Sequence, residues 1–261
     1  QEQSLLERLA GLRRRLLEAD PAEGAVIPLL YRPFDVRWLW AHPALLERGR
    51  WRVTRVMAGG QNLGLVFSRF TRGAPYRDAL ASRLPVEFGV LASRVSNRCS
   101  LAPLYLEPAI RSAPNLAPAF LAALSQRVDC DPLPEDVFGW LYALLWSPAF
   151  RQRYAAWLGQ DFPRLPLPHS REPFLALARL GRLLVDWHTL PPPPPAPAPA
   201  GEDLLIGSYR ALEHYQIARR RAHRPLTEAD IQAADRMRSA AAATRSLQAE
   251  IDRAAAEYAI L

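Results

Sequence analysis

Apolar residues near the start of the chain recur at a helical spacing. Between residues 4 and 19, leucines stand at positions 5, 6, 9, 12, 16 and 17, which places them along one side of a helix. The pattern predicts an amphipathic helix, and we interpret residues 1–24 as this helix and a linker. Such a helix buries its apolar side against the body of the domain or against a preceding domain.

From residue 26 to about residue 106 the apolar stretches become short. Examples are "VIPLLYRPF", "VRWLWA", "NLGLVFSRF" and "VEFGVLASRV", which are rich in β-branched and aromatic residues and are separated by Gly, Pro and Asn. Stretches of this kind are typical of strands. We therefore predict a mixed sheet over residues 25–110, with one or two short helices around residues 43–58.

Helical periodicity returns from about residue 115, and residues 111–190 are predicted to form a helical half. Asn115 is a candidate helix cap, with a proline in the first turn that follows. A break is expected at Ser147-Pro148, because proline disfavours helix at the preceding residue. The proline-rich segment 160–168 must be extended, and the long apolar stripe of residues 170–190 predicts another helix.

A run of prolines and alanines, "PPPPPAPAPA", follows at residues 191–200. We interpret 191–202 as a spacer of polyproline II geometry rather than as a ligand for a proline-binding partner. Residues 203–261 are predicted to form C-terminal helices over 203–221, 226–243 and 239–258, the last two being candidates for one continuous helix. The predicted fold class is α+β, with a basic mixed-sheet subdomain before a mostly helical one.

Positive charge is concentrated in the first hundred residues. Residues 1–100 carry 16 arginines against 9 acidic residues, whereas residues 101–261 carry 17 of each. Within residues 31–100 the count is 12 to 4. A basic field confined to one region indicates a polyanionic partner there. The alternative is a compositional bias that scatters arginine widely.

The chain contains no lysine, since all 33 basic residues are arginine. A phosphate-binding GxxxxGK[ST] loop and a Schiff-base nucleophile both need lysine, so these chemistries are excluded. No GxSxG, GxGxxG or NPPY-like motif is present. The five histidines, at 42, 169, 188, 214 and 223, are interpreted as surface or helix-face residues. We predict no catalytic, cofactor-binding or metal-binding residue.

The two cysteines, Cys99 and Cys130, form no CxxC pair and are interpreted as buried thiols in a reducing cytoplasm. No apolar run approaches the roughly 20 residues that span a bilayer. We therefore expect a cytoplasmic protein that has no membrane partner.

The arginine-rich region supplies the candidate contacts to double-stranded DNA. Arginine forks and amide side chains bind phosphate oxygens and base edges. Asp35 is expected to neutralise either Arg32 or Arg37 and to leave the other free, while Phe34 and Trp40 are assigned to the core. The predicted DNA-binding residues are Arg32, Arg37, Arg50, Arg52, Arg55, Arg69, Arg94, Asn97 and Arg98.

An ordered series of motifs resembles the C-terminal specificity domain of type ISP restriction-modification enzymes. The series is "YRPFDVRWLW", "NLGLVFSR", "LAPLYL", "PNLAP", "EDVFGWLYALLWSPAFRQRYAAWLGQDFPRLPLP" and "LIGSYRALEHY". The resemblance covers residues 25–258, and its part from 135 to 168 is the most specific.

The resemblance implies a target recognition domain that reads an asymmetric DNA site for an adenine-specific methyltransferase. S-adenosylmethionine would then bind to the methyltransferase domain, which is absent from this chain and acts in cis or in trans. The chain itself would hold no cofactor, and the helical half would support the sheet and contact the methyltransferase. In this view the chain is a piece of a longer protein or a separate subunit.

Two other functions remain open at this point. The chain could belong to an active adenine-specific DNA methyltransferase whose catalytic domain lies outside it. Alternatively, it is a helical protein-interaction module with incidental charge, which would bind DNA weakly and without sequence preference, or not at all.

Overall fold

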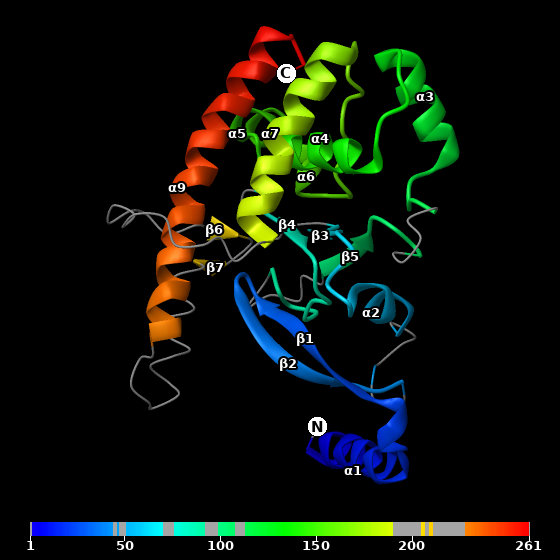
Figure 1. Cartoon of the computed structure of the whole chain (residues 1–261). Coiled ribbons are helices and arrows are strands. Elements are labelled where there is room, and N and C mark those ends of the chain that lie inside the picture. The colour runs from blue at the N-terminus through cyan, green and yellow to red at the C-terminus, as the bar shows by residue number, and fades with distance from the viewer. Residues whose placement is uncertain are drawn as a thin grey trace.

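A computed structural model of the chain describes residues 2–43, 46, 51–69, 76–91, 99–107, 113–189, 205–206, 209–210 and 228–260 (Figure 1). Small antiparallel sheets and a group of helices make up this part of the chain, so the α+β class is confirmed. Most of the helices lie at one end of the molecule, the N-terminal residues lie at the other, and a three-stranded sheet lies between them (Figure 1).

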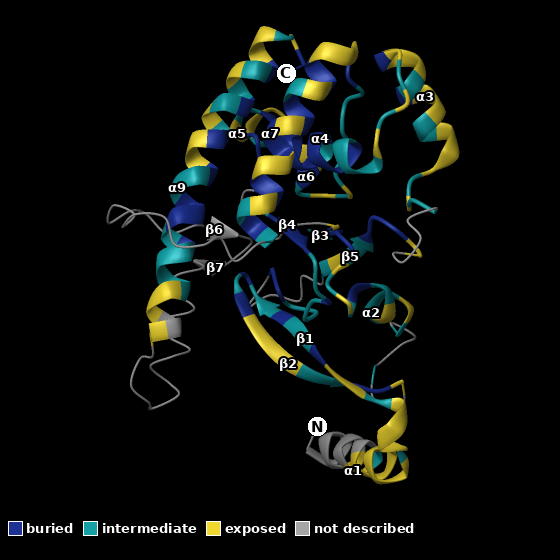
Figure 2. Cartoon of the chain, in the orientation of Figure 1, coloured by how far each residue is buried: buried dark blue, intermediate teal, exposed yellow. Residues whose placement is uncertain are grey.

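The predicted N-terminal helix is present as α1 (Glu2–Glu18). Its last turns expose Leu16 and Leu17. A short 3-10 turn, Pro21–Glu23, follows, and the side chain of Asp20 accepts a hydrogen bond from the backbone N–H of Ala22 at 2.9 Å. In Figure 2 the described part of α1 is mostly exposed, in contrast to the helices at the other end of the molecule.

Strands β1 (Ala25–Arg32) and β2 (Asp35–Ala41) form an antiparallel hairpin. Pro33 and Phe34 make the turn, and Phe34 has a φ of 63°, a left-handed conformation that costs an ordinary residue about 1–2 kcal/mol. Its ring lies edge-on to the ring of His188, with 6.4 Å between centroids, and packs against the main core. Trp40 is half-buried rather than part of the main core.

The second sheet has the strand order β4-β3-β5 and is antiparallel throughout. Its strands are β3 (Gly64–Ser68), β4 (Ala79–Ser82) and β5 (Cys99–Pro103). The short helix α2 (Trp51–Met57) precedes β3 and lies within the region predicted to hold one.

One parallel bridge, between Leu30 and Val86, joins the hairpin to the segment that follows β4. The backbone N–H of Leu30 donates to the carbonyl of Pro85, and its carbonyl accepts from Glu87 N–H, both at 2.9 Å. The strands thus form two small antiparallel sheets with one parallel bridge from the hairpin, whereas we predicted a single mixed sheet. A two-residue turn can join only antiparallel strands, because parallel neighbours need a crossover of a dozen or more residues.

The helical half contains α3 (Pro118–Val128), α4 (Pro134–Trp146), α5 (Pro148–Arg153), α6 (Ala155–Leu158) and α7 (Arg171–Thr189). The predicted break at Ser147-Pro148 is confirmed. The hydroxyl of Ser147 accepts from the N–H of Phe150 at 3.0 Å, so this residue ends α4 and caps α5.

Asn115 is not a helix cap, contrary to the prediction. Residue Ala117 occupies the cap position of α3 and makes no side-chain hydrogen bond there. The Asn115 side chain instead donates to the carbonyl of Pro103 at 3.0 Å, and its backbone N–H donates to the carbonyl of Leu104 at 2.7 Å. Asn115 therefore ties the start of the helical half to β5.

Helices α4 and α7 form the centre of the core, where they approach closely at two glycines. A Cβ on Gly181 would lie 1.8 Å from the carbonyl oxygen of Gly139, and one on Gly139 would lie 2.4 Å from that of Ala178. Glycine is needed at this crossing because the two backbones touch. Around it lie the fully buried Trp140, Tyr142, Trp146 and Phe174.

The last helix is α9 (Glu228–Glu257), so the two final predicted helices are indeed one. The prediction of helix over 203–221 is wrong at the described residues, because β6 (Leu205–Ile206) and β7 (Tyr209–Arg210) pair antiparallel. Ile and Tyr favour strand, and Gly207-Ser208 is a two-residue hairpin sequence. The predicted linker 191–202 lies outside the described residues.

Within the described ranges, no helix combines the length and the apolar character that a bilayer-spanning segment requires.

Candidate nucleic-acid interface

Five of the nine predicted DNA-binding residues lie within the described part of the chain. They are found on β1 (Arg32), β2 (Arg37), α2 (Arg52 and Arg55) and directly after β3 (Arg69). The other four, Arg50, Arg94, Asn97 and Arg98, lie outside the described residues.

Arg52 and Arg55 are exposed neighbours on α2. Their spacing of three residues places them on the same side of the helix. Neither forms an ion pair with a carboxylate in the described ranges. The helix is held to the sheet through Met57, which is fully buried and lies beside Gly64 at the start of β3. The helix that carries the two guanidinium groups is therefore anchored to the sheet, and the groups themselves reach solvent, where a polyanion can bind them.

Arg37 lies on β2 and is held by two contacts. Its Nε and Nη2 donate to Oδ2 of Asp35 at 3.3 and 3.1 Å, and its guanidinium lies over the ring of Tyr31 at 3.7 Å from the centroid. Asp35 is 2% exposed, whereas the side chain of Arg37 is 48% exposed. The carboxylate is thus an internal support for a guanidinium that reaches solvent.

Arg32 pairs with an acid that lies far away in the sequence. Its Nη1 donates to Oε2 of Glu87 at 2.5 Å and to the carbonyl of Tyr31 at 2.6 Å, and its side chain is 14% exposed. We expected Asp35 to neutralise either Arg32 or Arg37 and to leave the other free. It neutralises Arg37, but Arg32 is paired with Glu87. Glu87 reaches it because the parallel bridge at Leu30 brings the two strands together.

Arg69 follows β3 and contacts the proline-rich segment of the helical half. Its Nε donates to Oδ1 of Asp161 at 3.0 Å, and its guanidinium lies 5.5 Å from the ring centroid of Phe162. The backbone N–H of Phe162 and the Arg69 guanidinium keep the pKa of Asp161 below its usual value. Phe162 also packs edge-on against Phe67, with 5.7 Å between centroids. Residues 160–168 therefore hold the helical half to the sheet.

The described arginines do not form one patch. Arg69 follows the last residue of β3, while α2 packs beside Gly64, the first residue of the same strand. The hairpin arginines are neutralised locally. Among the predicted residues that the structure describes, only the α2 pair is exposed without an ion pair to a described carboxylate.

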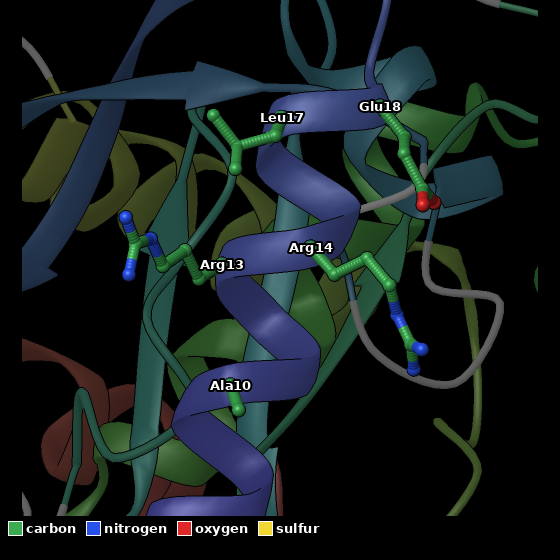
Figure 3. A pocket seen from close by; sticks show the side chains of 5 residues that line it. All are labelled: Ala10, Arg13, Arg14, Leu17 and Glu18. Carbon is green, nitrogen blue, oxygen red and sulfur yellow. The ribbon is translucent and has the colours of Figure 1, made fainter.

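Helix α1 carries further arginines beside a shallow pocket, but they do not converge. Figure 3 shows the lining residues Ala10, Arg13, Arg14, Leu17 and Glu18. Arg13 and Arg14 project from opposite sides of the helix, and Glu18 lies on the side of Arg14. This arrangement does not hold a single anionic group.

Trp38 is a surface residue that the prediction did not select. It is 74% exposed on β2, and Val36 and Val26 on the same hairpin are 47% and 66% exposed. The register pairs Trp38 with Pro28 and Val36 with Leu30, so these residues share one face of the hairpin. A tryptophan directly after an arginine is the sequence signal that could have identified this position.

His188 lies at the centre of a buried hydrogen-bonded chain rather than on the surface. The hydroxyl of Tyr142 accepts from Ala81 N–H at 3.0 Å and lies 2.6 Å from His188 Nδ1, and His188 Nε2 lies 2.9 Å from the hydroxyl of Thr244. That hydroxyl donates to the carbonyl of Ala240 at 2.6 Å. Every polar atom is satisfied if the imidazole is neutral and carries its proton on Nε2.

This series of hydrogen bonds through His188 joins β4, α4, α7 and α9, so the role of His188 is structural. Burial, with a smaller contribution from the charge of Arg151, lowers the pKa of His188 to about 3. The assignment of all histidines to surface or helix-face positions is wrong for His42, which follows β2 and is 1% exposed; His188 lies on a helix, but on its buried face.

A second buried polar group lies near Arg151. Burial lowers the pKa of its guanidinium to about 10 and raises the pKa of Asp78 to about 6. Arg151 Nε donates to the carbonyl of Leu145 at 2.6 Å, and Tyr76 donates to the carbonyl of Asp78 at 3.0 Å. These hydrogen bonds to backbone carbonyls give the group a structural role.

In the described part of the chain, no cluster of three or more His, Cys, Asp or Glu has the arrangement to hold a metal ion. Cys99 and Cys130 form no disulfide and are partly exposed rather than buried. The Sγ of Cys99 donates to the carbonyl of Phe88 at 3.1 Å.

Comparison with known families places nearly the whole chain in one of them. Residues 3–247 match the family described as the type ISP C-terminal specificity domain. No curated protein matches the chain.

Three solved structures share the fold over 87% of this chain. The DrdV–DNA complex, determined by cryo-EM, has 20% identity and a TM-score of 0.65. The ATP-dependent type ISP restriction-modification enzyme LlaBIII bound to DNA has 15% identity and a TM-score of 0.67. A nuclease-deletion mutant of the type ISP enzyme LlaGI, in complex with a DNA substrate mimic, has 16% identity and a TM-score of 0.59. The match covers 28%, 18% and 24% of those chains, respectively.

Proposed function

Because this chain belongs to the family of type ISP C-terminal specificity domains, we propose that it recognises a specific sequence in double-stranded DNA as part of a restriction-modification system. The observation that carries the proposal is the exposed pair Arg52 and Arg55 on α2, which lacks a carboxylate partner in the described ranges and is anchored to the sheet through Met57. The three structural relatives, each bound to DNA, support it.

Recognition requires two kinds of contact, and the chain offers residues for both. Phosphate contacts fix the register of a protein on the duplex, and contacts to base edges in the grooves read the sequence. Arg52 and Arg55 suit phosphate, since each presents a full positive charge to solvent. In the sequence, residues 47–50 directly before α2 add Arg48 and Arg50 against a single acid.

The chain has no donor-binding or catalytic motif of its own, so the reaction belongs to another domain. We place the methyl donor S-adenosylmethionine and the adenine chemistry in a methyltransferase domain outside this chain, in cis or in trans. The chain spans between 18% and 28% of the length of its structural relatives, which leaves room for such a domain in proteins of this kind.

Salt dependence of binding tests the proposal. Six or so phosphate contacts predict that the logarithm of the binding constant falls against the logarithm of salt concentration with a slope of about −5. Replacement of Arg52 and Arg55 by alanine removes two contacts and should reduce the slope by about 2, on every duplex tested. The measurement is fluorescence anisotropy of a labelled duplex at several salt concentrations.

The matched control removes two exposed arginines from the helical half. Arg127 on α3 and Arg253 on α9 are exposed, and their replacement by alanine changes the net charge by the same amount. The control should leave the slope within about 1 of the wild-type value. Equal losses in both double variants would mean that net charge, not the α2 surface, controls binding.

The two alternative functions predict different results. A helical protein-interaction module would bind DNA weakly and without sequence preference, or not at all. An active methyltransferase divided between two chains would bind DNA as proposed and would methylate adenine only when the catalytic domain is added. Selection of bound duplexes from a random pool at two ionic strengths separates sequence-specific binding from binding by charge alone.

A further inference from the structure

The hairpin strand β2 carries an arginine whose surroundings differ from those of the α2 pair. Strand β2 pairs with β1 alone among the described strands, so no described strand covers its outer edge. Arg37 on this strand is half-exposed and is paired with the buried Asp35. A neutral pair adds little to a salt-dependent attraction for phosphate, so a role for Arg37 must come from its geometry.

Asp35 engages only one side of the Arg37 guanidinium. A guanidinium has five N–H groups, and Asp35 Oδ2 accepts from Nε and from one N–H of Nη2. The two N–H groups of Nη1 and the second N–H of Nη2 have no hydrogen-bond partner in the described ranges. The end of the fork, which consists of one N–H from each terminal nitrogen, therefore remains available.

Tyr31 restricts the plane of the same guanidinium. Its ring lies 3.7 Å from Arg37 Cζ and 4.0 Å from Arg32 Cζ. Arg32 is itself held by Glu87 across the parallel bridge at Leu30. The orientation of the Arg37 fork is thus set by a buried carboxylate on one side and by an aromatic ring on its face, before any ligand binds.

We propose that Arg37 reads a guanine in the recognised DNA sequence and that Asp35 and Tyr31 are its positioning residues; this inference rests on the proposed function. Guanine presents O6 and N7 as paired acceptors in the major groove, and the end of an arginine fork is their matching donor pair. A two-stranded ribbon such as β1–β2 fits the width of that groove. Pre-orientation by two neighbours lowers the entropy lost on binding.

The test begins with the wild-type 261-residue chain and a random pool of duplex DNA. Selection gives a preferred duplex, and binding is then measured to that duplex and to each of its single base-pair variants. Arg37→Lys keeps the charge but removes the fork. It should lose about tenfold to a hundredfold of the preference at one G·C pair, with preferences elsewhere and the salt slope unchanged.

Arg55→Lys is the matched control, because it makes the same replacement at an exposed arginine assigned to phosphate. It should leave every base-pair preference within about twofold of wild type. Thermal unfolding of each variant verifies that the chain remains folded. If Arg37→Lys unfolds, Arg37→Gln provides a second variant that retains hydrogen-bonding groups without charge, and it should show the same loss at the same base pair.

Tyr31 tests positioning separately from contact. Tyr31→Phe retains the ring and should retain the preference, whereas Tyr31→Leu removes the ring and should weaken it at the same G·C pair. A residue with only a structural role would lower the melting temperature and change binding to all duplexes equally.

Two results would overturn the assignment and leave the proposed function intact. One is an Arg37→Lys chain that keeps the wild-type preference at every position, and the other is an Arg37→Lys chain that loses binding equally on all duplexes. A wild-type chain that binds every duplex equally, or that shows no salt-dependent DNA binding, would instead reject the proposed function itself.

Discussion

His188 shows how one buried side chain can connect elements that are distant in sequence. Its two ring nitrogens face Tyr142 on α4 and Thr244 on α9, and Tyr142 in turn accepts from Ala81 on β4. A neutral imidazole can accept at Nδ1 and donate at Nε2 at the same time, whereas the protonated ring must donate at both. Protonation of His188 therefore disrupts its hydrogen bond with the hydroxyl of Tyr142.

The pKa of His188 predicts the direction in which pH changes stability. In the unfolded chain a histidine titrates near 6.5, while burial lowers the folded value to about 3. Between these values the unfolded chain binds more protons, so the free energy of unfolding should fall as pH falls, by up to about 1.4 kcal/mol per pH unit. Above pH 6.5 the residue is neutral in both states and contributes no pH dependence.

Urea unfolding from pH 7 to pH 4 measures this dependence, and comparison with His188→Gln isolates it. Asp78 contributes with the opposite sign, because its folded pKa is raised to about 6 and protonation from there downward favours the folded state. The His188→Gln variant cannot titrate at this position. Its free energy of unfolding should therefore be lower than that of wild type at pH 7 and should decline less between pH 6.5 and pH 4. Parallel curves for the two proteins would contradict the assignment.

The packing of the helical core depends on how one pair of helices, α4 and α7, cross. Gly139 and Gly181 let the two backbones touch, and a methyl group at Gly181 would lie 1.8 Å from a carbonyl oxygen of the other helix. Backbone atoms cannot move aside as a flexible side chain does. The helices would have to separate and to break the aromatic packing around them.

Gly181→Ala should therefore lower the free energy of unfolding by about 3 kcal/mol or more, at the upper end of the effect of overpacking. Gly11→Ala is the control, since its added Cβ meets no atom within 4 Å and alanine favours helix by up to about 1 kcal/mol. Chemical denaturation of the two variants beside wild type gives both values. A Gly181→Ala chain as stable as wild type would mean that the crossing can widen at little cost.

Across the whole molecule, features set by neighbouring residues were predicted and features set by distant residues were not. The break at Ser147-Pro148 and the N-terminal helix α1 follow from local rules and are present. Arg32, by contrast, pairs with Glu87, which lies 55 residues away in the sequence. Arg69 pairs with Asp161, which lies 92 residues away. Only the fold brings them together.

In the candidate site, too, some features follow from the local sequence and others only from the fold. Charge and composition identified the arginine-rich region, but only the fold distinguishes the exposed Arg52 and Arg55 from Arg32, which is paired and largely buried. Arg37 shows a further limit, because Asp35 is two residues away and its pairing was foreseeable, while the side-on geometry that leaves the fork available was not. Local order along a strand does not determine which N–H groups a carboxylate engages.

The place of α9 in the molecule yields a last prediction. Although the Pro/Ala-rich segment precedes it, α9 belongs to the same core as the helical half, since Ile251 and Ala255 are fully buried and Thr244 bonds to His188. Asp252 also accepts hydrogen bonds from the Ser147 hydroxyl and from the N–H of Ala149, the latter at 3.1 Å to Oδ2. The C-terminal helix should thus remain attached after the chain is cut between residues 191 and 200.

A specific protease site placed in that segment allows the cut to be made in the folded protein. The two fragments should elute together in size-exclusion chromatography, and Asp252→Ala together with Thr244→Val should weaken their association because buried acceptors and donors lose their partners. Arg253→Ala, at an exposed position of the same helix, should not. Separation of the wild-type fragments would show instead that α9 is an independent module, and the core would then have to be complete without Ile251 and Ala255.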